Sequence, residues 1–421
     1  MNLMRLAWQS LLNRKVTALL TIFSIALSVA LLLGVEKVRS GARASFVHTI
    51  SGTDLVVGSR AGAVQLLLYS VFRIGDATAN ITWETVEDIQ SRPEVKWVVP
   101  VSLGDSHRGF RVMGTSAAYF EHFRYRRNQP LVLEEGERFS DLYDTVLGHK
   151  VASELGYEIG SEIVVSHGTG RVSFGQDHTE KPFKVVGILE PTGTPVDRTI
   201  HVSMQAIEAI HVGWESGAAP RGDDVVSAED VRAMALEPKS ATALFVGLKS
   251  RMMTFSLQRW INTYKAEALS AILPGVAFGQ LWNMLGNVES ALIAISAMVV
   301  FTALLGMVVS VLGSLNERRR EMAILRALGG GPIHIFGLLM LEAMVLVVAG
   351  VVVGVVAVTL ILYAGRALIE RETGLYLELN VIATSEIYLL LAIIIGGIIA
   401  SIVPAIRAYR MSLVDGLVAR T

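Results

Sequence analysis

The chain contains no cysteine in its 421 residues. Disulfides, thiolate metal sites and cysteine nucleophiles are therefore excluded. Charged residues are also scarce, because they form 18% of the chain whereas soluble proteins average about 25%. The 37 lysines and arginines nearly balance the 38 aspartates and glutamates. This balance leaves no general basic field for nucleic acid, and we expect no nucleic acid partner.

The motifs of common hydrolytic enzymes are missing as well. ATP hydrolysis would need a glycine-rich phosphate loop that ends in Gly-Lys, and no glycine in the chain is followed by lysine. The G-x-S-x-G elbow and the H-E-x-x-H helix are absent too. His167–Gly170 resembles an oxyanion-hole loop, but we interpret it as a turn because no nucleophile accompanies it. We therefore expect no catalytic residue and no cofactor in this chain.

Long uncharged runs are what the sequence has in abundance, and its mean hydropathy is +0.49. A helix needs about 20 apolar residues to cross a bilayer, because its backbone must bond within the segment. Four runs are long enough: Val16–Val35, Ala291–Gly313, Ile333–Ala364 and Ile387–Ile406. The first is about twice as long as a signal-peptide core, which favours a retained span. Only the third contains a charge, Glu342, which we expect to be an intramembrane polar residue facing the protein interior.

Lysine and arginine near the spans predict their orientation, because cytoplasmic flanks carry an excess of these residues. Such residues precede the first run, separate the second from the third, and follow the fourth: Arg5, Arg14, Lys15, Arg318, Arg319, Arg320, Arg326, Arg407, Arg410 and Arg420. The loop after the third run carries no positive excess. We therefore expect a multi-pass membrane protein, with both termini cytoplasmic and residues 40–285 extracytoplasmic.

The segment between the first two spans is too long for a loop. Short strand patterns alternate in it with helical patterns, which favours an α+β domain. We expect strands at Asp54–Val57, Val95–Val101, Glu162–Val165, Phe183–Leu189 and Thr242–Leu248. We expect helices at Trp83–Ile89, Ala117–Phe123, Val146–Leu155, Met204–Ile210 and Phe255–Ile272, and a loop at Gly213–Gly222. The predicted fold is a membrane α-helical protein with four transmembrane helices, one plus three, and a large α+β extracytoplasmic domain. Its parts are 1–39, 40–285 and 286–421.

Most of the nine histidines fall in the extracytoplasmic segment. Imidazole is the commonest metal ligand in proteins, and four histidines and Asp177 lie within one stretch of sequence: His167, His178, His201 and His211. Their spacing matches no compact ligand motif. We therefore keep these histidines as weak candidates and expect ordinary hydrogen bonds for them.

The segment after the second span is the most informative one. It begins with a basic turn and continues with apolar residues at helical spacing, followed by three glycines and Pro332. We predict a short amphipathic helix at the cytoplasmic membrane surface within residues 316–330. Its candidate contact residues are Glu317, Arg318, Arg319, Arg320, Glu321, Met322, Leu325, Leu328 and Gly329. The alternative is a charge cluster that only anchors the chain to lipid.

Residues 317–329 resemble a signature of the MacB, LolC and FtsX superfamily of ABC permeases. Further similar segments are Leu11–Lys15, Ser51–Gly58, Val185–Leu189 and Pro404–Arg410. The resemblance implies a mechanotransmission permease of the bacterial inner membrane, with its large domain in the periplasm, that acts as a dimer with a second copy or a paralogue. It also implies a separate cytoplasmic ABC ATPase that binds ATP and Mg²⁺ and docks on the coupling helix 316–330. A periplasmic adaptor or substrate-binding protein is a further implied partner, besides the lipid bilayer.

Three interpretations remain open from the sequence. The first is a permease that exports or extracts an envelope substrate. The second is an FtsX-like signal transmitter that activates an envelope partner without transport. The third is a membrane-anchored binding or metal-handling protein that has no ATPase. The large domain is bigger than in the cell-division members that the chain resembles, which favours the first over the second.

Overall fold

The computed structural model describes most of the chain. It describes residues 3–47, 49–126, 128–168, 178–214, 226–315, 322, 324, 327, 329–373 and 383–414. These residues form two compact units. One unit consists of Met1–Ala42, Leu285–Ile369 and Leu377–Thr421 and contains most of each long helix, and the other consists of Arg43–Met284 and Glu370–Tyr376.

Four long apolar helices build the helical unit: α2 (Lys15–Val47), α10 (Pro274–Ser314), α12 (Pro332–Thr373) and α13 (Thr384–Val414). Each is long and apolar enough to cross a membrane. The four predicted transmembrane helices are therefore confirmed. Each helix extends beyond its apolar run, because a helix can continue into water once it leaves the hydrocarbon layer.

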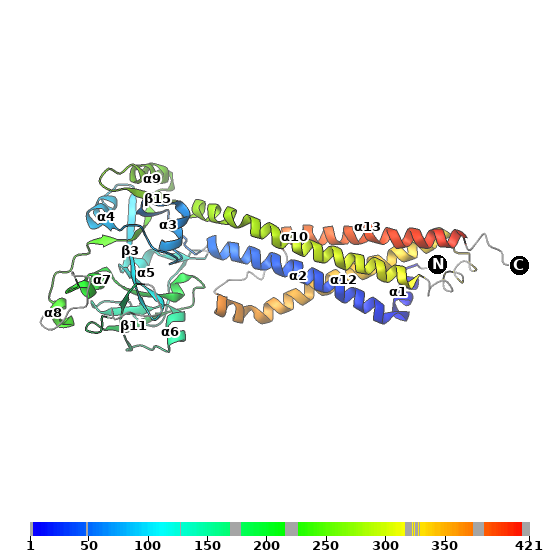
Figure 1. The fold of residues 1–421 in the computed structure, drawn as a ribbon, viewed down its shortest axis with the longest axis horizontal. Helices are drawn as coiled ribbons and strands as arrows, with labels where there is room; N and C mark the ends of the chain where they lie inside the picture. The colour runs from blue at the N-terminus through cyan, green and yellow to red at the C-terminus, as the bar shows by residue number, and fades with distance from the viewer. Residues whose placement is uncertain are drawn as a thin grey trace. The chain divides into compact units, whose positions relative to one another are not determined.

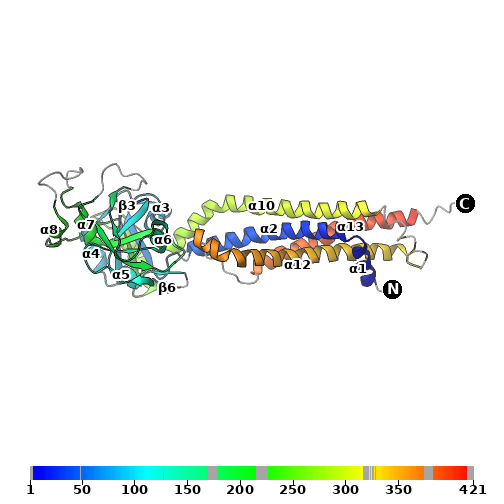
Figure 2. The ribbon, with the colours of Figure 1, turned by 90° about the horizontal axis from the view of Figure 1, so that it is seen from below.

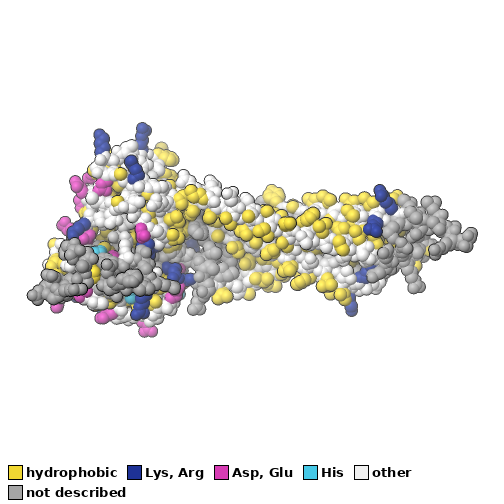
Figure 3. Space-filling model, in the orientation of Figure 1, with side chains coloured by type: hydrophobic (Ala, Val, Ile, Leu, Met, Phe, Trp, Pro, Cys, Tyr) yellow, Lys and Arg dark blue, Asp and Glu magenta, His cyan; other side chains and the backbone are white. Residues whose placement is uncertain are grey.

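The apolar surface of the helical unit faces outward as well as inward. Only 22–39% of the most apolar window of each span is buried inside the unit. Figure 3 shows hydrophobic side chains over its visible face, with lysine and arginine gathered near one end. An outward apolar surface of this kind suits contact with lipid chains.

The segments that we predict to be cytoplasmic lie at one end of the helical unit, as far as the structure describes them. The short helix α1 (Leu3–Asn13) lies there, together with the last turns of α10 and α13 and the first turns of α12 (Figures 1 and 2). This arrangement agrees with a chain that crosses the same layer four times.

The second unit is built on a mixed sheet, with the strand order β15-β1-β14-β3-β4-β12-β8-β11-β7 in the described residues. The strands of this path are β1 (Leu55–Ser59), β3 (Val95–His107), β4 (Phe110–Thr115), β7 (Leu133–Gly136), β8 (Asp144–Leu147), β11 (Phe183–Leu189), β12 (Thr199–Ser203), β14 (Ala243–Leu248) and β15 (Leu269–Ile272). Neighbours are antiparallel except β4–β12 and β8–β11. Shorter strands are β2 (Ile81–Thr82), β5 (Arg124–Tyr125), β6 (Gln129–Pro130), β9 (Glu162–Ile163), β10 (Ser166–His167) and β13 (Ser240–Ala241).

Short helices cover both faces of this sheet. They are α3 (Ala63–Ser70), α4 (Trp83–Gln90), α5 (Ala118–His122), α6 (His149–Leu155), α7 (Met204–His211), α8 (Ala228–Arg232), α9 (Thr254–Asn262) and the 3₁₀ turns η1 (Pro195–Arg198) and η3 (Arg251–Met253). On β1, Val56 packs in a core with α3 and α5, whereas Leu55 and Val57 pack in a core with α4 and α9. Side chains alternate between faces along a strand, so a sheet covered on both sides needs the continuous apolar strands seen here. The predicted α+β domain between spans 1 and 2 is confirmed.

Two predicted helices are wrong in part. The expected helix Val146–Leu155 begins only at His149, because Val146 and Leu147 belong to β8 and pair with β11 and β12. The expected helix Phe255–Ile272 ends at Asn262, and its last residues form β15, which pairs with β1. In both cases a strand partner distant in sequence outweighs the local helical spacing. The strand predicted at Glu162–Val165 is shorter than expected, and most of the predicted loop at Gly213–Gly222 lies outside the described residues.

Candidate functional site

The end of α10 leads into the predicted coupling segment and is held by two polar contacts. The Arg14 guanidinium donates a hydrogen bond of 3.0 Å to the carbonyl oxygen of Ser314. A cation at the C-terminal end of a helix is favourable, because the last carbonyls carry partial negative charge. The hydroxyls of Thr21 and Ser310 are 3.3 Å apart, which joins α2 to α10. The coupling segment therefore follows a firmly positioned helix end.

Most of the predicted coupling residues lie outside the described part of the chain: Glu317, Arg318, Arg319, Arg320, Glu321, Leu325 and Leu328. Met322 is half-buried and packs against the apolar core of the helical unit. Ile324 is 54% exposed. Gly329 has a φ of +90°, which favours glycine, and α12 begins at Pro332 soon after it. Met322 thus contacts the spans, while the exposed Ile324 is free to meet another surface.

Glu342 is only 5% exposed although it belongs to a membrane-spanning helix. Its neighbour Ala343 is fully buried and belongs with Leu339 to the apolar core of the helical unit, and Leu346, a turn further along, is also buried. The side chain of Glu342 is therefore enclosed by the helical unit. An ionisable residue in that position is costly in lipid and marks a functional candidate.

Glycines allow α12 to approach α2 closely. A Cβ atom added at Gly350 would lie 2.7 Å from Ile25 Cβ, and one at Gly354 would lie 2.7 Å from the carbonyl oxygen of Ala26. The two glycines are one helical turn apart, in the G-x-x-x-G pattern that permits close helix contact in membranes. This contact fixes the third span against the first.

Five charged residues at the other end of the helices were missed by the sequence analysis. They are Glu36, Lys37, Arg39, Glu289 and Glu386, and they pair between α2, α10 and α13. Each lies just outside a predicted apolar run. In these flanks, the sequence analysis considered charge only to predict the orientation of the spans. Opposite charges at the ends of three spans are the signal that could have indicated them.

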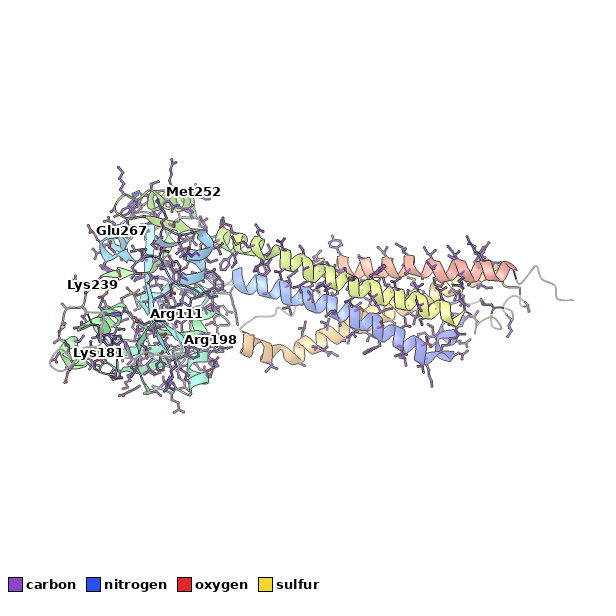
Figure 4. The ribbon with its side chains drawn as sticks, viewed as in Figure 1. Arg111, Lys181, Arg198, Lys239, Met252 and Glu267 are labelled. Carbon is purple, nitrogen blue, oxygen red and sulfur yellow. The ribbon has the colours of Figure 1, made fainter. Side chains whose placement is uncertain are left out.

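The candidate metal histidines do not meet in one place. The rings of His178 and His211 pack with their centroids 5.9 Å apart, and His178 also packs beside Trp214. The buried Lys181 (Figure 4) donates a hydrogen bond of 2.6 Å to the carbonyl oxygen of Val212, next to His211. His201 packs on Tyr119 instead. The side chain of His167 and all of Asp177 lie outside the described residues. Among the residues that the structure describes, no three histidines or acids form a group able to hold a metal ion.

His201 is buried in the sheet domain. Its Nδ1 atom lies 3.1 Å from the carbonyl oxygen of Val146. Burial and, to a smaller extent, the nearby Arg73 charge lower the pKa of His201 to about 3, although the hydrogen bond to Val146 opposes this shift. The imidazole is therefore neutral at physiological pH and serves the packing of the domain.

Two family models match this chain. A MacB-like periplasmic core domain covers residues 18–245, more than half of the chain, and an FtsX-like permease C-terminal domain covers residues 293–413. The macrolide export ATP-binding/permease protein MacB of Nitrobacter winogradskyi is 23% identical over 98% of this chain and 59% of its own length. The pyoverdine export ATP-binding/permease protein PvdT of Pseudomonas syringae pv. syringae is 23% identical over 98% of this chain and 58% of its own length. The chain thus spans less than two thirds of these relatives.

Solved structures give weaker similarities. The periplasmic region of MacB from Actinobacillus actinomycetemcomitans matches with a TM-score of 0.34 at 11% identity, over 56% of this chain and 95% of that one. The extracellular domain of the ABC-type transporter YknZ from Gram-positive bacteria matches with a TM-score of 0.30 at 14% identity, over 52% and 98%. Structural similarity at these TM-scores is too low to support the family assignment beyond what the family models show.

Proposed function

This chain belongs to the MacB-like and FtsX-like family of ABC transporter permeases, and on that premise we propose that it couples ATP hydrolysis in a cytoplasmic ATPase to movement of its extracytoplasmic domain. The ATPase binds ATP and Mg²⁺, since these 421 residues contain no phosphate loop. The permease acts as a dimer with a second copy or a paralogue. Its substrate is exported or extracted from the envelope side of the inner membrane.

One observation carries this proposal: α10 is a single uninterrupted helix from Pro274 to Ser314. Its 41 residues correspond to about 60 Å at 1.5 Å per residue, about twice the thickness of the hydrocarbon layer. One end directly follows β15 of the sheet domain, and the other end leads into the coupling segment. A continuous helix transmits a shift of one end to the other better than a flexible loop does.

The two ends of α10 suit this role. At the coupling end, Arg14 and Thr21 hold the helix to the start of the chain. The predicted coupling helix then presents basic and apolar residues to the cytoplasm. An ATPase that docks there would move α10 along with the segment, and the sheet domain would respond.

Purification of a tagged full-length chain from membranes in mild detergent tests the proposal. We expect an ABC ATPase to co-purify in a fixed ratio and to hydrolyse ATP in the complex. A matched preparation from cells that carry the tag alone controls for unspecific binding. Recovery of the chain without any ATPase, at several detergent strengths, would contradict the proposed function.

A further inference from the structure

Charged side chains join three helices at the end of the helical unit opposite to the coupling segment. The Lys37 ammonium lies 3.0 Å from a carboxylate oxygen of Glu386, which links α2 to α13. Arg39 donates two hydrogen bonds, of 2.9 and 2.7 Å, to Glu36 on its own helix. Arg39 also pairs with Glu289, which links α2 to α10. We name these five residues the ion-pair node.

The spacing of the two cations explains why one helix can hold two others. Lys37 and Arg39 are two residues apart, so their side chains project about 200° apart around α2. Each cation therefore faces a different neighbour. Glu36 lies three residues before Arg39 and on the same face, where it can orient the guanidinium. Glu386 also accepts a 3.2 Å hydrogen bond from the backbone amide of Ala383, which fixes it to the start of α13.

Burial distinguishes the node from ordinary surface ion pairs. No side chain in it is more than 25% exposed, and Glu386 is only 4% exposed. In the sheet domain, by contrast, the pair Arg198–Glu154 is about half exposed (Figure 4). Exposed pairs contribute little to stability, whereas removal of one member of a buried pair leaves a buried charge without compensation. The node therefore holds the three helices together beside the ends of their apolar runs.

The position of the node relates it to coupling. α2 leads into the sheet domain and α10 leads out of it, so these two helices carry the chain between the first two spans and that domain. We propose that Lys37 and Arg39, with Glu36, Glu289 and Glu386, are positioning residues that make α2, α10 and α13 move as one body at the node during the ATP cycle. This inference rests on the proposed function of the chain.

Spin labels test the node in the full-length chain, which has no native cysteine to interfere. Leu31, Leu292 and Leu391 are exposed residues near the node on α2, α10 and α13 and can be replaced by cysteine for labelling. We expect a narrow α2–α13 distance distribution that broadens in Lys37→Ala. The α2–α10 distribution should broaden in Arg39→Ala instead. The control Arg198→Ala should change neither distribution.

A charge exchange separates pairing from unspecific damage. The variant Lys37→Glu/Glu386→Lys keeps both charges in exchanged places, and we expect it to restore the narrow α2–α13 distribution that each single change broadens. Wild-type distributions in both single variants would overturn the node. Failure of the exchange to restore the distance would also overturn it, because pairing would then not be the cause. These distances need no ATPase, so they decide on the node even if no ATPase binds the chain.

A covalent link between α2 and α13 tests whether the helices move as one body at the node. In Lys37→Cys/Glu386→Cys, we expect ATP turnover of the complex to fall by about tenfold, within the usual range of coupling free energies. A short bifunctional thiosulfonate that joins the two cysteines should restore ATP turnover. Reduction of the new disulfides should return turnover to the value of the unlinked variant. The amount of bound ATPase should stay constant throughout. If the linked variant has no ATP turnover while the unlinked variant keeps wild-type turnover, α2 and α13 must separate at the node during the cycle. The proposal is then wrong.

Discussion

Replacement of Gly354 by alanine should separate α12 from α2. The new Cβ atom would lie 2.7 Å from the carbonyl oxygen of Ala26, 2.8 Å from Val29 Cβ and 2.9 Å from Val29 Cγ1. Real Cβ atoms essentially never approach other atoms to less than 3.0 Å. The backbone oxygen cannot turn aside as a flexible side chain could. The two helices must therefore move apart, and their other contacts loosen.

The expected magnitude follows from a comparison within one helix. Overpacking of a close contact costs about 1–3 kcal/mol, while alanine gains up to about 1 kcal/mol over glycine in helix propensity. Gly337 lies on the same helix and has no atom within 4 Å of an added Cβ. The propensity gain is common to both sites, so Gly354→Ala should be less stable than Gly337→Ala by about 1–3 kcal/mol. Gly397→Ala should fall between them, because the three atoms nearest to its added Cβ all belong to the side chain of Val347 and none to the backbone.

Equilibrium unfolding of the purified chain in mixed detergent micelles measures this difference. We expect the midpoint of Gly354→Ala to shift to lower denaturing detergent, and that of Gly337→Ala to stay or rise. Circular dichroism before unfolding checks that both variants are equally helical. Equal midpoints for the two variants would refute the close contact of α2 with α12.

Three further predictions concern charge and topology. His201 has a pKa of about 3 in the folded chain and about 6.5 when unfolded. Its contribution to stability is therefore complete above pH 6.5 and is lost as the pH falls toward 3, with a slope of up to about 1.4 kcal/mol per pH unit. His201→Gln should flatten the pH dependence of thermal unfolding, and an unchanged slope would contradict this. Glu342→Gln should preserve assembly, measured by size-exclusion chromatography, whereas Glu342→Leu should weaken it; equal behaviour of both variants would argue against an interior polar role. An alkaline phosphatase fusion after Gly217 should be active and one after Leu328 inactive, and the reverse pattern would invert the topology.

The spans could be predicted from the sequence because lipid leaves the backbone few choices. A long uncharged run such as Ile333–Ala364 must form a helix, since its backbone has no water to bond. Strands were predicted where apolar β-branched residues dominate, as in Phe183–Leu189, which the structure confirms. β15 was not predicted, because Leu269–Ile272 continues the apolar spacing of α9 and becomes a strand only through pairing with β1, far away in sequence.

The candidate site was less predictable than the fold. The ion-pair node depends on which helix ends are neighbours, and the charges of Lys37 and Glu386 carry no information on that in the sequence. The close contact at Gly354 has the same origin, because a glycine pattern does not name its partner helix. The histidines were only weak metal candidates in the sequence, and His178 and His201, which are near in sequence, pack in different surroundings.

Binding of the ATPase to coupling-helix variants tests the central claim most directly. A docking helix owes its binding to apolar anchors, and truncation of a central anchor commonly costs more than about 1 kcal/mol. A lipid anchor owes its hold to basic residues, at about 1 kcal/mol per charge. We predict that Leu325→Ala and Leu328→Asp lose co-purified ATPase and its ATP hydrolysis while the chain still reaches the membrane, and that Arg319→Glu has a smaller effect. Full ATPase binding and activity in the leucine variants, with membrane levels that fall on charge reversal, would show that the segment is only an anchor and would contradict the account.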